Sequence, residues 1–122
     1  MTRRIFVLFA IFAVGALALA SLGLASSKAP KLLGETGPGF TIELKMGGKD
    51  VKTLKAGSYS LTVEDKAAIH NFRLKGPGLN KQVTTVPFVG KKTVTVTLKK
   101  GTYTFQCDPH AASGMKGTFR VT

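Results

Sequence analysis

The residues most able to do chemistry in this chain lie in one short stretch, FQCDPHAASGM, which runs from Phe105 to Met115. It contains the only cysteine of the chain, Cys107, together with His110 and Met115. The second histidine of the chain, His70, lies well upstream. A thiolate, two imidazoles and a weak axial thioether form the ligand set of a blue-copper electron-transfer site. The pattern Cys-x2-His-x4-Met, with His70 as the fourth member, therefore predicts a copper site.

Each candidate ligand also has an ordinary structural interpretation. Cys107 is compatible with an inert core thiol, and Met115 with a side chain that fills a gap in the core. His70 is compatible with a hydrogen-bonded strand histidine, and His110 with a plain loop histidine. An unprotected thiol in an exported protein oxidises or cross-links, however, unless it is buried or bound to a metal. The combination therefore favours the metal interpretation.

The elements that must position these residues are β-strands. Apolar and polar residues alternate with period two in several segments that Gly or Pro separates, and no segment after residue 25 has helical periodicity over three turns. The segments are Phe40–Met46, Ser58–Glu64, His70–Leu74, Val94–Leu98, Thr102–Cys107 and Gly117–Val121. This pattern predicts an all-β fold, an antiparallel β-sandwich of about seven or eight strands.

An internal repeat predicts where the thiol points. The segments LKAGSYSLTV (54–63) and LKKGTYTFQC (98–107) share the order Leu-Lys-x-Gly, hydroxyl, Tyr, hydroxyl, apolar, polar. The repeat aligns Cys107 with Val63. We therefore expect Cys107 to face the core at the end of an interior strand.

The N-terminal segment has the organisation of an export signal. Arg3 and Arg4 precede an apolar run from Ile5 to Ala20, and small residues follow as far as Ala25. Residues 5–25 are also about long enough to span a bilayer as an uncleaved anchor helix. We expect residues 1–25 to be a signal peptide or an anchor, 26–39 to be a Pro/Gly/Ser-rich flexible linker, and 40–122 to be the folded domain. The protein is accordingly expected in the periplasm, at the cell surface or outside the cell.

The charge of the chain favours an anionic partner. The chain has 18 Lys and Arg against 6 Asp and Glu, and without Arg3 and Arg4 the formal charge is +10. Such a charge favours an acidic protein or an anionic membrane or envelope surface. Nucleic acid is not expected, because the lysines are scattered and no aromatic residues are interleaved with them. An enzyme is not expected either, because the sequence has no second histidine cluster and no nucleophile–base pair apart from the candidate ligands. We expect a monomer.

Three stretches resemble the cupredoxins, the small type 1 blue copper proteins, in their plastocyanin, amicyanin and pseudoazurin branch. They are HNF from His70, GTYTFQC ending at Cys107, and the segment from CDPH to MKGTFRV ending at Val121. The resemblance covers about residues 40–122. It implies a Greek-key β-sandwich that binds one type 1 copper ion and carries single electrons between larger redox partners.

The resemblance also implies residue roles. Carried over by position, the expected copper ligands are His70, Cys107, His110 and Met115. Asn71 is expected to tie the ligand loops together by hydrogen bonds and so to orient the ligands. The ring edge of His110 is expected to be exposed as the route for electrons.

Other functions are compatible with parts of this pattern. A copper storage or delivery protein uses the same ligands without shuttling electrons, and a metal-free basic β-sandwich that binds anionic surface polymers needs none of them. The chain also departs from plant plastocyanins, which meet a basic partner with acidic patches. Because this chain is basic, we expect its redox partner to present an acidic docking surface.

Overall fold

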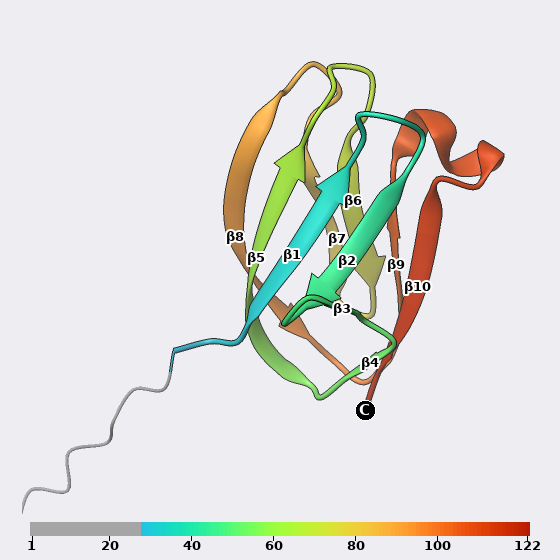
Figure 1. The fold of residues 1–122 in the computed structure, drawn as a ribbon. Coiled ribbons are helices and arrows are strands. Elements are labelled where there is room, and N and C mark those ends of the chain that lie inside the picture. The colour runs from blue at the N-terminus through green and yellow to red at the C-terminus, as the bar shows by residue number, and fades with distance from the viewer. Residues whose placement is uncertain (1–27) are drawn as a thin grey trace, which may run out of the picture.

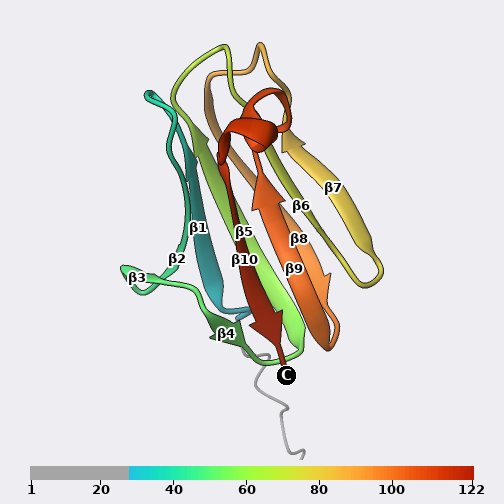
Figure 2. The same cartoon turned by 90° about the vertical axis from the view of Figure 1, so that its right-hand side faces the viewer.

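The computed structural model describes residues 28–122, which form two five-stranded sheets packed face to face (Figure 1, Figure 2). The predicted signal peptide or anchor, residues 1–25, lies outside the described residues. Within residues 28–122 no helix is both long enough and apolar enough to cross a membrane. In chain order the elements are β1 (Lys31–Thr36), β2 (Ile42–Met46), β3 (Lys49–Asp50), β4 (Thr53–Leu54), β5 (Gly57–Asp65), β6 (Phe72–Gly76), β7 (Leu79–Thr84), β8 (Gly90–Leu98), β9 (Gly101–Gln106), the 3₁₀ helix η1 (Asp108–Ser113) and β10 (Lys116–Val121).

The two sheets are mixed rather than antiparallel. Their strand orders are β3-β2-β1-β5-β8 and β4-β10-β9-β6-β7. Strand β1 runs parallel to β5, and β4 runs parallel to β10. The all-β prediction is confirmed, but the prediction of purely antiparallel pairing is wrong. The number of strands in the described residues is ten rather than seven or eight.

Strand β1 corrects the prediction of a linker over residues 26–39. Lys31–Thr36 lies inside a sheet, with β2 on one side and β5 on the other. Its inward positions are Leu32, Gly34 and Thr36. Only one of these three is a large apolar side chain, so the sequence lacks the usual strand alternation. Gly34 is small because a Cβ atom there would lie 2.8 Å from Cε2 of Phe72.

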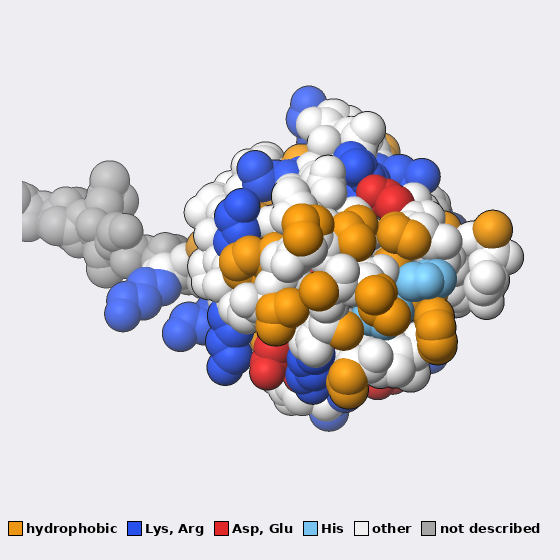
Figure 3. Space-filling view, turned by 90° about the horizontal axis from the view of Figure 1, so that it is seen from above, with side chains coloured by type: hydrophobic (Ala, Val, Ile, Leu, Met, Phe, Trp, Pro, Cys, Tyr) orange, Lys and Arg blue, Asp and Glu red, His pale blue; other side chains and the backbone are white. Residues whose placement is uncertain are grey.

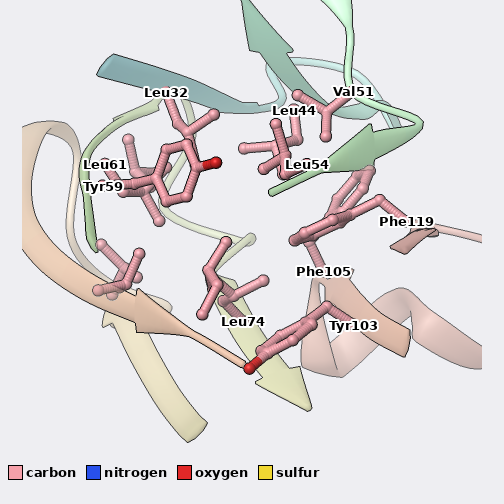
Figure 4. Close-up of a cluster of buried hydrophobic side chains, with 14 of the residues drawn as sticks. Leu32, Leu44, Val51, Leu54, Tyr59, Leu61, Leu74, Tyr103, Phe105 and Phe119 are labelled. Atoms are coloured by element: carbon pink, nitrogen blue, oxygen red, sulfur yellow. The ribbon is translucent and has the colours of Figure 1, made fainter. Parts of the chain in front are cut away.

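The core lies between the sheets and is built from alternate residues of both (Figure 4). Val63 on β5 and Phe72 on β6 are fully buried. The ring of Phe72 stacks on that of Phe105 with 6.0 Å between their centroids. Cys107, directly after β9, is also 0% exposed. The inward orientation that the internal repeat predicted for Cys107 is therefore confirmed.

Four connections meet at the end of the sandwich drawn at the top of Figure 1. They are residues 37–41, 66–71 and 85–89, and the segment 107–115 that contains η1. The buried polar side chains of the described residues all lie at this end: Thr36, Asp65, His70, Asn71 and Thr84. Because burying polar groups is costly unless they are satisfied, this concentration marks a site rather than a feature of general packing.

Candidate metal centre

The side chains of His70, Cys107 and His110 converge at this end of the molecule. The Cys107 Sγ atom lies 3.6 Å from Nδ1 of His70 and 3.4 Å from Nδ1 of His110, and the two Nδ1 atoms are 3.1 Å apart. A point equidistant from these three atoms is about 2.0 Å from each, close to the bond lengths that metals form with imidazole and thiolate. The three donor atoms are therefore spaced to hold a single ion. Their mixture of nitrogen and sulfur suits copper.

His70 is held by backbone on two sides. It precedes β6 rather than lying within a strand as predicted, and its N–H donates to the Ala67 carbonyl at 3.3 Å. A Cβ atom at Gly37 would lie 2.8 Å from Cδ2 of the His70 ring, and Gly37 has a φ of +77°. Position 37 therefore requires glycine both for its backbone conformation and for this close approach. The ring of His70 is 0% exposed.

A short 3₁₀ helix, η1, occupies most of the segment between Cys107 and Met115. Pro109 lies in its first turn, and Gly114 ends it in the left-handed conformation. The Cys107 N–H donates to the Met115 carbonyl at 3.0 Å, and the Met115 N–H donates to the His110 carbonyl at 3.1 Å. Backbone hydrogen bonds thus connect the three predicted ligands of this segment. The Met115 side chain is 3% exposed.

Asn71 joins the two segments that carry the histidines. Its Nδ2 donates to Oδ2 of Asp108 at 2.9 Å, and its Oδ1 accepts from the Asp108 N–H at 2.7 Å. The Asp108 carboxylate also accepts from Nε of Arg73 and Nε2 of Gln106. Burial acts to raise the pKa of Asp108, but the hydrogen bonds from Gln106, Asn71 and Arg73 outweigh it and hold that pKa below its ordinary value. The Asp108 carboxylate is therefore ionised, and hydrogen bonds from three side chains hold it in place next to Cys107.

Sequence reasoning missed two residues of this site. The sequence gives only a weak signal for Asp108, because an acidic residue is favourable in the first turn of a helix. The sequence gives no signal that Phe40 belongs to the site. It was predicted to begin a strand, but it precedes β2, is 67% exposed, and sets its ring edge-on against His70 and His110 with centroids 5.5 and 4.9 Å apart.

The outer surface of this end is apolar around the histidines. His110 is partly exposed, in contrast to the buried His70. Besides Phe40, the large side chains of Ile69 and Val89 are exposed at 52% and 58%. Figure 3 shows hydrophobic side chains across the middle of this end and beside the histidines, with Lys and Arg mostly toward the rim. The site therefore opens onto a surface with few charges.

Comparisons with known proteins agree with this geometry. The sequence profile of the copper binding proteins of the plastocyanin/azurin family matches residues 41–122. A plastocyanin from Daucus carota is 63% identical over 30 residues, which span 25% of this chain and 30% of the carrot protein. A crystal structure of the copper protein rusticyanin superposes with a TM-score of 0.58 at 24% identity over 80% of each chain. Rusticyanin from Thiobacillus ferrooxidans gives 0.51 at 24% identity, over 80% of this chain and 79% of its own.

The rusticyanin structures establish a shared fold, and the profile match covers most of the residues that form it. The buried thiol and the two converging imidazoles supply a donor set that suits the ion named by that family. The chain therefore belongs to the plastocyanin/azurin family of copper-binding proteins, the cupredoxins, and its cofactor is one type 1 copper ion.

Proposed function

We propose that this protein is an exported electron carrier, not an enzyme, and that His70, Cys107, His110 and Met115 hold its copper ion. The observation that carries the proposal is the convergence of Sγ and two Nδ1 atoms within bonding reach of one point. Copper held by these residues would supply the Cu(I)/Cu(II) couple, and the weakly donating thioether of Met115 would help to set its potential.

The protein frame around these side chains supports electron transfer. His70 is buried against Gly37, Cys107 is bonded through its backbone to Met115, and Asn71 connects their segments. Ligands held in this way keep their positions when the charge of the ion changes. Little reorganisation then opposes the gain or loss of an electron.

The surface of the site supports His110 as the route for electrons. His110 is the partly exposed histidine, and apolar side chains surround it. A partner protein can cover such a surface without stripping water from charged groups, which is costly. We propose that the redox partner contacts this end of the molecule, so that its own centre comes close to His110.

A second surface is proposed to select the partner by charge. The outer face of the sheet β4-β10-β9-β6-β7 has basic residues at its outward positions, and we call it the basic face: Arg73, Lys75, Lys116 and Arg120. Arg73 and Lys116 flank Gln106 in the strand register, next to the ligand segment. The acidic residue at its border, Asp108, is already paired with Arg73 at 2.9 Å.

The opposite face has no such excess. Its outward positions carry residues of both signs, among them Glu35, Glu43, Glu64, Lys31, Lys45 and Lys91. Lys45 pairs with Glu43 at 2.9 Å. Since opposite charges steer association, we propose that the redox partner presents carboxylates to the basic face.

The experiment that tests the copper site is a visible absorption and EPR titration of residues 26–122 with Cu(II), beside the variant Cys107→Ser. We expect an intense blue thiolate-to-copper band in the parent protein and its loss in the variant. Ser113→Ala, in the same segment but outside the donor set, is the matched control and should keep the band. Copper uptake without colour would favour storage or delivery over electron transfer, and no uptake would overturn the proposal.

A further inference from the structure

Three buried polar atoms at the His70 end of the sandwich have no hydrogen-bond partner among the described residues. They are Nε2 of His70, Oδ2 of Asp65 and Oγ1 of Thr36. Their residues are at most 1% exposed. Nearly all buried polar atoms in folded proteins are hydrogen-bonded. Three unpartnered atoms at one place therefore need a common explanation.

The backbone brings the three residues together. Thr36 and Asp65 are direct partners in the parallel register of β1 and β5, and both side chains point inward. The Oδ1 atom of Asp65 accepts from the Ala67 N–H at 3.4 Å, and the Ala67 carbonyl accepts from the His70 N–H. Gly37, the neighbour of Thr36, lies against the Cδ2–Nε2 edge of the His70 ring.

The three atoms are also complementary as donors and acceptors. When Nδ1 of a histidine binds a metal, its Nε2 carries the proton and must donate. A hydroxyl both accepts and donates, and a carboxylate oxygen accepts. Metal-binding histidines usually donate this second N–H to a carboxylate, a carbonyl or a water molecule, which fixes the ring and raises its basicity.

We propose that Thr36 and Asp65 form a hydrogen-bond relay that positions His70 for copper. No two of these atoms are within hydrogen-bond geometry of each other in the structure, so the relay requires a side-chain adjustment, after which the Nε2–H of His70 donates to Oγ1 of Thr36 and the Thr36 hydroxyl donates to Oδ2 of Asp65. The relay satisfies all three atoms at once and selects the tautomer whose Nδ1 is free for the ion. It rests on the proposed role of His70 as a ligand.

The hydrogen bond to His70 has a consequence for redox chemistry. A ring whose Nε2–H is hydrogen-bonded is a stronger donor at Nδ1. A stronger donor stabilises Cu(II) more than Cu(I), because Cu(II) has the larger positive charge. The relay therefore lowers the reduction potential of the copper ion.

The test compares Asp65→Asn and Thr36→Val with Thr36→Ser and Glu64→Gln. Glu64 is the neighbour of Asp65 on the outward side of β5, so Glu64→Gln makes the same carboxyl-to-amide change away from His70. We expect Asp65→Asn and Thr36→Val to raise the midpoint potential. Thr36→Ser, which retains the hydroxyl, and Glu64→Gln should stay close to the parent protein.

A second readout needs no copper. In the metal-free protein, ¹⁵N NMR of the His70 ring should show the Nε2–H tautomer with slow proton exchange. Thr36→Val should shift the tautomer ratio toward Nδ1–H and speed the exchange, whether or not Asp65→Asn folds. If the parent protein forms no blue copper centre, the proposed function is wrong. The His70 tautomer measurement in the metal-free protein still tests whether the relay exists. Equal potentials and equal His70 tautomers in the parent protein, Thr36→Val and Glu64→Gln would overturn the relay.

Discussion

At the scale of single residues, the side chain of Cys107 combines a buried position with the ability to bind a metal. Its thiol is fully buried and lies within 3.6 Å of two imidazole nitrogens. Burial keeps oxidants away from the sulfur, and a metal stabilises its thiolate form. The same position therefore explains why a free cysteine is tolerated and why it is useful.

Met115 gives the first prediction. If Met115 is the weak thioether ligand proposed here, Met115→Leu removes that donor but keeps the apolar volume. We expect the blue band to remain and the reduction potential to rise, because Cu(II) loses a donor that Cu(I) needs less. Cyclic voltammetry measures the change, and Met46→Leu at an exposed position is the control. An unchanged potential in Met115→Leu would show that Met115 only fills space.

A second prediction concerns Gly34. An added methyl group would meet the ring of Phe72 at 2.8 Å, so Gly34→Ala overpacks the core. Overpacking costs about 1–3 kcal/mol of unfolding free energy. Urea denaturation of the metal-free protein measures this loss. Gly39→Ala is the matched control, since nothing lies within 4 Å of a Cβ atom there.

At the scale of elements, the site depends on a link between the start of β6 and η1. Asn71 is 0% exposed and makes two hydrogen bonds to Asp108. Asn71→Ala leaves the part-buried N–H of Asp108 and one of its carboxylate oxygens without this partner. We expect a loss of about 1–3 kcal/mol in unfolding free energy.

Asn80→Ala serves as the comparison for this third prediction. Asn80 is exposed and accepts a hydrogen bond from Arg73 at 3.0 Å. Surface substitutions usually change stability by no more than about 0.5 kcal/mol. Equal urea midpoints for the two variants would contradict the structural role of Asn71.

Strand β1 gives a fourth prediction at the same scale. Because β1 pairs with both β2 and β5, its removal would split one sheet, take Leu32 out of the core and expose Leu44 and Leu61. A chain that begins at residue 28 should fold, and a chain that begins at residue 37 should not. Circular dichroism and amide exchange distinguish the two. A folded second chain would restore the linker interpretation.

At the scale of the whole molecule, charge is distributed unequally over the two faces. The basic face has outward Lys75, Lys116 and Arg120 free of the acidic pairing that Arg73 makes with Asp108. We therefore expect Lys75→Glu with Arg120→Glu to slow electron exchange with an acidic redox protein and to weaken its dependence on salt.

Stopped-flow rates at several ionic strengths test this fifth prediction. Lys31→Glu with Lys91→Glu makes the same change of net charge on the opposite face and is the control. If both pairs of substitutions slow the reaction equally, net charge rather than the basic face steers the partner. Loss of the blue band in either variant would instead indicate damage to the site.

Much of this protein was predictable from local sequence pattern. The alternation of residues predicted an all-β fold, and the repeat between 54–63 and 98–107 placed Cys107 inside. Residue types and the spacing from Cys107 to Met115 proposed the copper ligands. These features depend on near neighbours along the chain, or on the intrinsic chemistry of a few rare side chains, and so they can be read without a structure.

Features that depend on distant pairing were decided only by the tertiary structure. Residues 31–36 look like a linker because Gly34 and Thr36 replace the expected apolar residues, and the ring of Phe72 is the reason for Gly34. The parallel register of β1 and β5 then sets Thr36 beside Asp65, and the 66–71 connection returns His70 to the same place. No local sequence pattern encodes the proximity of Thr36, Asp65 and His70, because it arises when segments far apart in the chain bury their surfaces against one another.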